Sequence, residues 1–264
     1  MRVIKLMILV MISVSASAAF AEEIATKEPQ KFYSGSIETG YEERYLTLRT
    51  NRLIHNGPMQ WTNLRLEFPN FFFNIWSSAE LSDEANNCGQ EIDITAGLKA
   101  QAYGLEAKIS TTLLDLYPVE TFWKDDNWAQ TLELTKQIKL SEKQSLKAQA
   151  VIEWLSPAAD FSDGCLALRP NIGYFVNQPF GDLPILAGLE LKNNFMINWN
   201  DGFKRANNSY DGVFLRYTGG IIWKIAEDIQ LQAPGITVLI PLTRTDDDRD
   251  EVNSSLNCRL IFNF

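Results

Sequence analysis

Apolar and polar residues alternate through much of this chain, and that alternation restricts the folds open to it. The pattern is clearest in residues 90–101, 104–115 and 145–155. A period of two residues puts apolar side chains on one face of a β-strand and polar side chains on the other. Segments of roughly ten residues with this pattern, separated by turn residues, are typical of transmembrane barrels. The sequence therefore predicts an all-β fold, a transmembrane antiparallel up-and-down β-barrel of about twelve strands.

Connections of two lengths separate the predicted strands. Short connections, such as Pro69 and Glu227, alternate with long ones, such as 81–89 and 116–126. Transmembrane barrels have short periplasmic turns and longer outer loops, and an even strand number leaves both chain ends on the short-turn side. We predict strands at 33–50, 59–68, 70–80, 90–101, 104–115, 127–140, 145–156, 165–177, 184–199, 210–226, 228–241 and 252–264. The alternation shifts across 42–44, which predicts a bulge in the first strand.

Aromatic residues fall where a membrane barrel needs them. Trp128, Trp154 and Trp199 lie near predicted outer strand ends, and Phe71 and Trp223 lie near inner ends. Amphipathic rings favour these two membrane interfaces. A soluble β-sandwich is the competing architecture, because it also contains short alternating strands. A sandwich would bury its aromatic residues in one shared core and would not need connections of alternating length.

The predicted last strand alternates as far as the final residue, Phe264, with Leu256, Leu260 and Phe262 on the same face. A strand that ends on an aromatic carboxy terminus resembles the closing strand of bacterial outer-membrane barrels. The resemblance implies that Phe264 is an assembly signal and that the barrel-assembly machinery is a partner.

The amino-terminal residues have the pattern of an export signal. Arg2 and Lys5 precede an apolar run, residues 6–14, and small residues follow, up to Ala21. This order is typical of a cleaved signal peptide, and the run is too short for a membrane-spanning helix of ~20 residues. We expect a signal peptide at 1–21, a flexible lead at 22–31 and a barrel at 32–264. The location would be the outer membrane of a Gram-negative bacterium, with outer-membrane lipid and lipopolysaccharide as partners.

Composition excludes several functions. The net charge of −9 argues against nucleic-acid binding, which needs a basic face. His55 is the single histidine, so a multi-histidine metal site is impossible, and its setting in a turn sequence disfavours a catalytic base. Asp246, Asp248 and Asp250 are spaced like the start of an EF-hand, but the glycine and glutamate that the motif needs are absent. We expect no catalytic residue, no cofactor and no metal ligand.

Three cysteines are an odd number for an exported chain. Cys258 lies on the apolar face of the last strand, where it acts as a small hydrophobic residue. Cys88 and Cys165 fall in predicted outer loops, and an oxidising compartment allows a disulfide between them. The sequence leaves their bonding open, because the separation of two loops cannot be read from it.

Charged residues on the polar face of each predicted strand are expected to point into the barrel, because a charge that faces lipid costs ~2–4 kcal/mol at the middle of the bilayer. Their two signs nearly balance, which argues against the strong selectivity that a ring of one sign would give. Acidic residues in the long loops predict a modest preference for cations at low salt. The predicted pore lining is Arg65, Glu67, Glu91, Asp93, Lys99, Glu106, Lys108, Glu133, Lys147, Glu153, Arg169, Glu190, Lys192, Arg216 and Arg259.

Several segments carry a further resemblance. Residues 35–45, 74–78, 90–97 and 132–134 resemble strands of the TorF-like family of outer-membrane porins. The resemblance spans most of the chain after the signal segment. It implies an outer-membrane barrel with an unassigned substrate, and it implies no catalytic residue and no cofactor. It favours a pore only by analogy of fold.

These observations together predict a porin-like channel for the passive diffusion of small polar solutes. Two alternatives stay open. One is a structural or adhesive barrel whose lumen is filled by salt bridges and which transports nothing. The other is a barrel enzyme acting on lipid, which would depend on His55.

Overall fold

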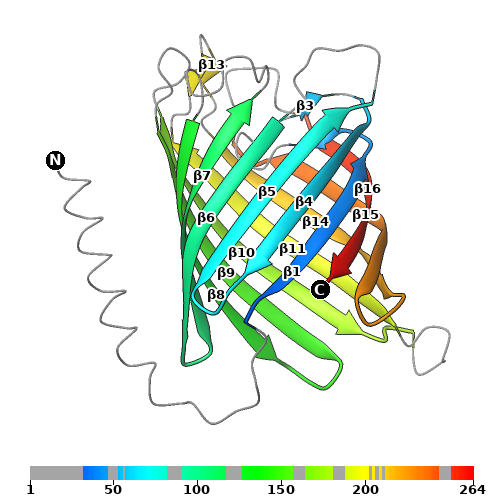
Figure 1. Cartoon of the computed structure of the whole chain (residues 1–264). Helices are drawn as coiled ribbons and strands as arrows, with labels where there is room; N and C mark the ends of the chain where they lie inside the picture. Colours follow the sequence, from blue (N-terminus) through cyan, green and yellow to red (C-terminus); the bar gives the residue numbers. More distant parts are fainter. Residues whose placement is uncertain are drawn as a thin grey trace.

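The computed structural model describes residues 32–46, 53–55, 57–81, 91–116, 127–156, 164–180, 188–201, 204–205, 208–209, 212–243 and 251–264. Strands dominate these ranges, and twelve of them close into one barrel (Figure 1). Within the same ranges, no helix is long and apolar enough to cross a membrane.

The strands of the barrel run from one end of the cylinder to the other. They are β1 (Ser34–Glu42), β4 (Met59–Glu67), β5 (Phe71–Glu80), β6 (Glu91–Ala102), β7 (Leu105–Leu116), β8 (Asn127–Lys139), β9 (Gln144–Leu155), β10 (Cys165–Asn177), β11 (Leu189–Asp201), β14 (Gly212–Lys224), β15 (Ile229–Pro241) and β16 (Asn253–Asn263). Two short pairs form separate sheets that are not part of the ring: β2 (Tyr45–Leu46) with β3 (Leu53–His55), and β12 (Lys204–Arg205) with β13 (Asn208–Ser209).

Each barrel strand pairs antiparallel with its neighbours in the chain, and the ring closes between β1 and β16. At this seam Ser36 lies opposite Asn263, and Glu42 lies opposite Asn257. The other edge of β1 pairs with β4. The predicted twelve-stranded antiparallel barrel is therefore confirmed. The β-sandwich is wrong, because a closed ring has no second sheet packed against its inner face.

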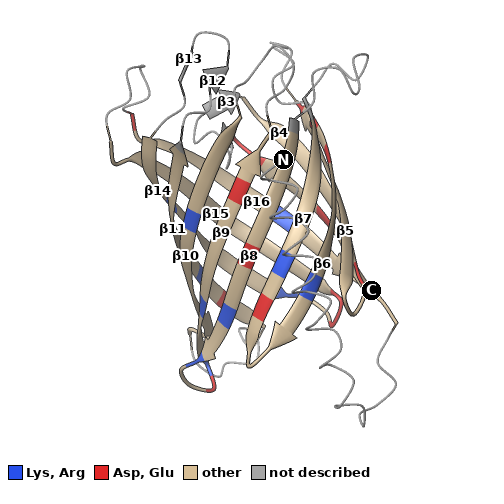
Figure 2. Cartoon of the chain, turned by 90° about the vertical axis from the view of Figure 1, so that its left-hand side faces the viewer, with Lys and Arg blue, Asp and Glu red and all other residues tan. Residues whose placement is uncertain are grey.

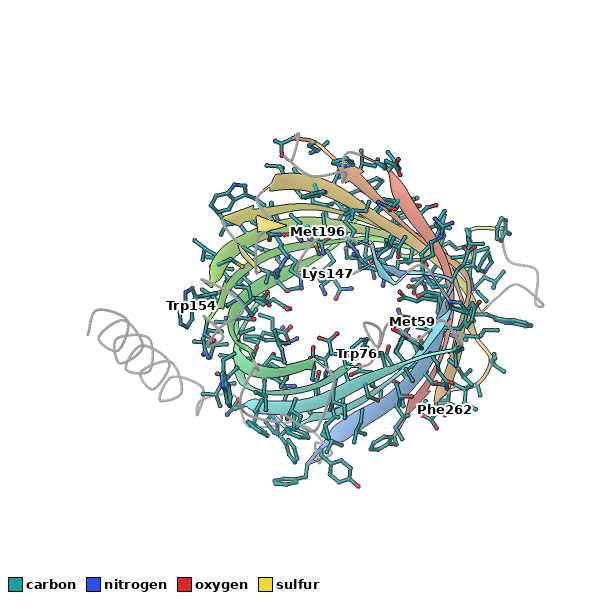
Figure 3. The ribbon with its side chains drawn as sticks, turned by 90° about the horizontal axis from the view of Figure 1, so that it is seen from above. Met59, Trp76, Lys147, Trp154, Met196 and Phe262 are labelled. Atoms are coloured by element: carbon teal, nitrogen blue, oxygen red, sulfur yellow. The ribbon has the colours of Figure 1, made fainter. Side chains whose placement is uncertain are left out.

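The outer surface of the ring is apolar. Ile172 of β10 is 57% exposed, Phe195 of β11 is 50% exposed and Leu98 of β6 is 47% exposed. Figure 3 shows Trp154 and Phe262 directed away from the barrel axis. A soluble monomer rarely exposes a continuous apolar surface of this kind, whereas lipid chains would cover it.

One predicted strand boundary is wrong. The sequence predicts a first strand that continues to residue 50, but β1 ends at Glu42, where the alternation shifts. The chain then leaves the wall instead of forming a simple bulge. The ninth predicted strand starts at residue 184, and β11 starts at Leu189. Residues 184–187 lie outside the described ranges, so that part of the prediction stays a prediction.

The structure has a bulge in β15. Gln232 lies opposite Arg259 of β16, but the next inward-facing pair is Gly235 with Asn257, so β15 contains one extra residue there. The pairing of β15 with β14 shifts at the same place. The bulge contains Pro234, which cannot donate a ladder hydrogen bond. Because of the extra residue, Gln232 and Gly235 both face the lumen.

Candidate functional site on the inner wall of the barrel

Two residues of β9 fix the orientation of the wall. Figure 3 shows Lys147 pointing toward the barrel axis and Trp154 pointing away from it. Residues opposite each other on paired strands share a face, and so do residues two apart on one strand. Lys147 lies opposite Gln137 of β8 and Gly173 of β10. In the same way, the pairing registers of the other strands show which residues of each strand face the lumen.

The charged residues that the sequence predicts for the pore lining all occupy positions on this inner face. Figure 2 shows that basic and acidic residues lie along the strands themselves as well as at their ends. The residues concerned are Arg65 and Glu67 on β4, Glu91, Asp93 and Lys99 on β6, Glu106 and Lys108 on β7, Glu133 on β8, Lys147 and Glu153 on β9, Arg169 on β10, Glu190 and Lys192 on β11, Arg216 on β14, and Arg259 on β16.

Two chains of ion pairs lie toward the short-turn end of β4 to β8. Glu67 contacts both Arg65 on its own strand and Lys99 on β6. Lys108 lies 2.8 Å from Glu106 and 3.9 Å from Glu133 of β8. Lys99 and Lys108 lie directly opposite each other. The carboxylates on either side offset this repulsion between like charges.

A buried group lies closer to the long-loop end. Arg169 of β10 donates to Glu153 of β9 at 2.8 Å and to Oδ1 of Asn198 on β11 at 3.2 Å. Thr131 of β8 donates to the second oxygen of Glu153 at 3.4 Å. Arg169, Glu153 and Asn198 are all buried, so their charges and dipoles are satisfied within the wall.

Sequence reasoning missed three inward carboxylates. Glu38 of β1 accepts a hydrogen bond from Arg259 at 3.2 Å across the seam. Glu42 of β1 and Glu80 of β5 both lie opposite Met59 of β4, whose side chain Figure 3 shows on the lumen side. Because alternation in the first strand is irregular, the sequence did not show which face of the strand carries Glu38 and Glu42. The register with β4 was needed to assign it.

Aromatic rings also line the lumen, and several of them lie over glycines. Phe72 of β5 faces Gly97 of β6, and Phe72 ring atoms lie 2.5 Å from where a Gly97 Cβ would be. Phe175 lies over Gly173 in the same way, with ring atoms 2.8 and 3.1 Å from that position. A glycine lets a ring lie against the backbone of the strand. These aromatic residues therefore extend less into the lumen than their size suggests.

The segment after β1 enters the mouth of the barrel. Oγ of Ser255 accepts a hydrogen bond from the backbone N–H of Arg44 at 3.1 Å and donates to its carbonyl at 2.9 Å. Arg216 of β14 donates to the carbonyl of Leu46 at 3.0 Å. Ser255 and Arg216 both lie on the inner face, and Leu46 is 2% exposed. Residues 44–46 therefore cross the inner surface from β16 to β14.

The structure describes one of the two cysteines of the predicted disulfide, and it describes the carboxy-terminal phenylalanine. Cys165 starts β10 and packs against Leu114, Ala129 and Leu155, while Cys88 lies outside the described residues, so the disulfide stays a prediction. Phe264 exchanges two backbone hydrogen bonds with Gly35, of 2.9 and 3.0 Å, and so extends the seam.

The histidine, possible metal ligands and the predicted export segment complete the set of residues considered in the sequence. His55 is the last residue of β3. Within the described part of the chain, no group of three or more His, Cys, Asp or Glu residues is placed to hold a metal ion. The predicted signal peptide and flexible lead, and the Asp246–Asp250 segment, lie outside the described residues.

Comparison with known proteins supports the barrel. No protein-family model matches the sequence, and no curated protein sequence matches it either. Solved structures do match. An outer membrane channel from Pseudomonas putida F1 is 14% identical, with a TM-score of 0.50 over 90% of this chain and 100% of that chain.

Two porins give similar values. The KdgM porin is 9% identical, with a TM-score of 0.51 over 87% of this chain and 99% of the porin. The NanC porin is 6% identical, with a TM-score of 0.51 over 86% of this chain and 98% of the porin. This chain has the fold of an outer-membrane barrel. At these identities the likeness concerns the fold alone, and membership of the TorF-like family stays a prediction.

Proposed function

We propose that this protein is an outer-membrane channel for the passive diffusion of small polar solutes. The outer face is apolar around the ring, and the inner face carries charged, amide and hydroxyl groups. A lipid-covered cylinder with a polar interior gives a water-soluble molecule a route that avoids the hydrocarbon region.

One observation carries the proposal: the ion pairs named above run along the surface of the wall. Glu153 with Arg169, Glu133 with Lys108, and Glu38 with Arg259 each join adjacent strands, and Glu67 with Lys99 spans only one intervening strand. A lumen filled by salt bridges would instead join strands on opposite sides. In the view along the axis, the drawn side chains of the wall leave a space at the centre (Figure 3).

Two features favour a narrow passage. Trp76 of β5 and Met59 of β4 point to the lumen side in Figure 3. The segment at residues 44–46 covers part of the inner surface near the long loops. Small solutes fit this arrangement better than large ones, because each inward group reduces the width that water can fill.

The cellular setting belongs to the same proposal. An export signal at residues 1–21 and a flexible lead at 22–31 would precede the barrel, and Phe264 at the seam would be read by the barrel-assembly machinery. Outer-membrane lipid and lipopolysaccharide would surround the apolar face and the long loops. The pairing of Phe264 with Gly35 supports a role for the terminal residue in closing the ring.

A liposome-swelling assay tests the function. Refolded protein in liposomes should admit small sugars faster than larger ones, and planar bilayers containing it should show discrete current steps. Folded protein that gives neither swelling nor current would refute the channel and favour a structural or adhesive barrel. Lipid turnover that is lost in His55→Ala would instead identify an enzyme.

A further inference from the structure

Lys147 of β9 and Lys192 of β11 differ from five other inward cations described above. Arg65, Lys99, Lys108, Arg169 and Arg259 each lie within 4 Å of a carboxylate. Neither Lys147 nor Lys192 forms a salt bridge with any residue that the structure describes. Both are half-buried, and Figure 3 shows Lys147 directed into the lumen. Their ammonium groups therefore remain able to receive an anion from the lumen.

The register explains why neither lysine forms a salt bridge with a residue on a neighbouring strand. The residues opposite Lys147 are Gln137 and Gly173. The residues opposite Lys192 are Phe175 and Gly220. None of these four residues carries a negative charge. Glu190 shares the inner face of β11 with Lys192 but forms no salt bridge with it.

The surface between the two lysines is aromatic. Strand β10 separates β9 from β11, and its inward residues at this level are Gly173 and Phe175. The Phe175 ring is folded back over Gly173, with ring atoms 2.8 and 3.1 Å from where a Gly173 Cβ would be. The ring therefore lies beside Lys147, and its own backbone is paired with Lys192.

We propose that Lys147, Phe175 and Lys192 form a binding site for small organic carboxylates on the inner wall. The ammonium groups would donate charge-assisted hydrogen bonds to the carboxylate, and the apolar body of the solute would lie on the Phe175 ring. The site rests on the proposed function, because the lumen must admit the solute. It gives the channel a preferred class of solute that the balanced charge of the whole wall does not predict.

Benzoate is a suitable probe, because it combines one carboxylate with one apolar ring. Saturation-transfer NMR on the refolded protein in detergent micelles measures its dissociation constant without requiring conductance. Lys147→Gln with Lys192→Gln should weaken benzoate binding about tenfold, since two charge-assisted contacts are lost. Lys147→Arg with Lys192→Arg should retain binding, because both charges remain.

Matched controls separate this site from general effects. Lys136→Gln with Lys143→Gln removes the same charge from two exposed positions, one on the outer face of β8 and one in the turn that follows it, and should leave benzoate binding unchanged, including any partition into micelles. Phe175→Leu should weaken benzoate binding more than acetate binding. Benzyl alcohol, which has the ring without the charge, should bind more weakly than benzoate. Equal binding of benzoate by the two glutamine double variants would overturn the site, and so would equal binding of benzyl alcohol.

The outcomes distinguish this inference from the proposed function. Benzoate binding in a protein that gives no current would preserve the site and refute the channel. Current steps in a protein that binds benzoate no better than the Lys147→Gln, Lys192→Gln variant would preserve the channel and refute the site.

Discussion

Arg169 of β10 donates a hydrogen bond to Glu153 of β9 at 2.8 Å, and both side chains are buried in the wall of the barrel. Arg169 also donates to Asn198 of β11, and Glu153 also accepts from Thr131 of β8. The pair thus links four consecutive strands. Its burial distinguishes it from the other ion pairs of the wall, which are more exposed.

Arg169→Ala should lower the free energy of unfolding by about 3–5 kcal/mol, because it leaves Glu153 charged and buried without its partner. Urea unfolding of the protein in lipid vesicles measures the change. Arg259→Ala is the comparison, since the Arg259 pair with Glu38 is more exposed and should contribute about 1 kcal/mol or less. Equal losses in the two variants would contradict the importance of burial.

Ile172→Arg should impair membrane insertion. Ile172 lies on the outer face near the middle of β10, where an arginine in contact with lipid costs ~2–4 kcal/mol. The fraction of heat-resistant, folded protein after refolding into vesicles measures insertion. Asn171→Arg places the same residue on the lumen face of the same strand and should refold far better. Equal refolding of both variants would show that the two faces are wrongly assigned.

Trp76→Ala should raise single-channel conductance, because Trp76 points into the lumen and its removal widens the water-filled path. Trp154→Ala removes the same side chain from the outer face and should leave conductance unchanged. Planar-bilayer recordings compare the two variants under identical salt conditions. An unchanged conductance in Trp76→Ala would mean that the narrowest part of the passage lies elsewhere.

Ser255→Ala should make the current noisier. The substitution removes both hydrogen bonds that hold Arg44 against the inner face, each contributing about 0.5–1.5 kcal/mol. The segment at residues 44–46 would then leave the wall more often, and bilayer recordings would show larger current fluctuations. Ser254→Ala, at the adjacent outward position of β16, should behave as the unchanged protein does. If neither variant shows larger current fluctuations than the unchanged protein, other contacts hold residues 44–46 in place.

Cys88 and Cys165 should be joined in protein recovered from an oxidising compartment. Peptide mass mapping without reduction should find the two cysteines in one cross-linked fragment, and Cys258 as a free thiol on the outer face of β16. Detection of Cys88 and Cys165 as separate free thiols would rule the disulfide out.

Much of the barrel follows from local pattern. The alternation in 90–101 and 104–115 appears in the structure as β6 and β7 with the predicted faces, because a strand exposed to lipid on one side and water on the other must alternate. The first strand was harder to predict. Its parity shift indicated an irregularity, but the pattern could not show that the chain turns into the lumen, since that path depends on Ser255 and Arg216 far along the sequence.

The sequence by itself determined the fold class, the number of strands and the side of the wall on which most charges lie. These follow from a period of two and from alternating connection lengths, which are local properties. Only the tertiary structure decided which charges meet. Lys99 contacts Glu67, while Lys147 and Lys192 face Gln137, Gly173, Phe175 and Gly220, because cross-strand register sets each residue's neighbours and register depends on how the whole ring closes.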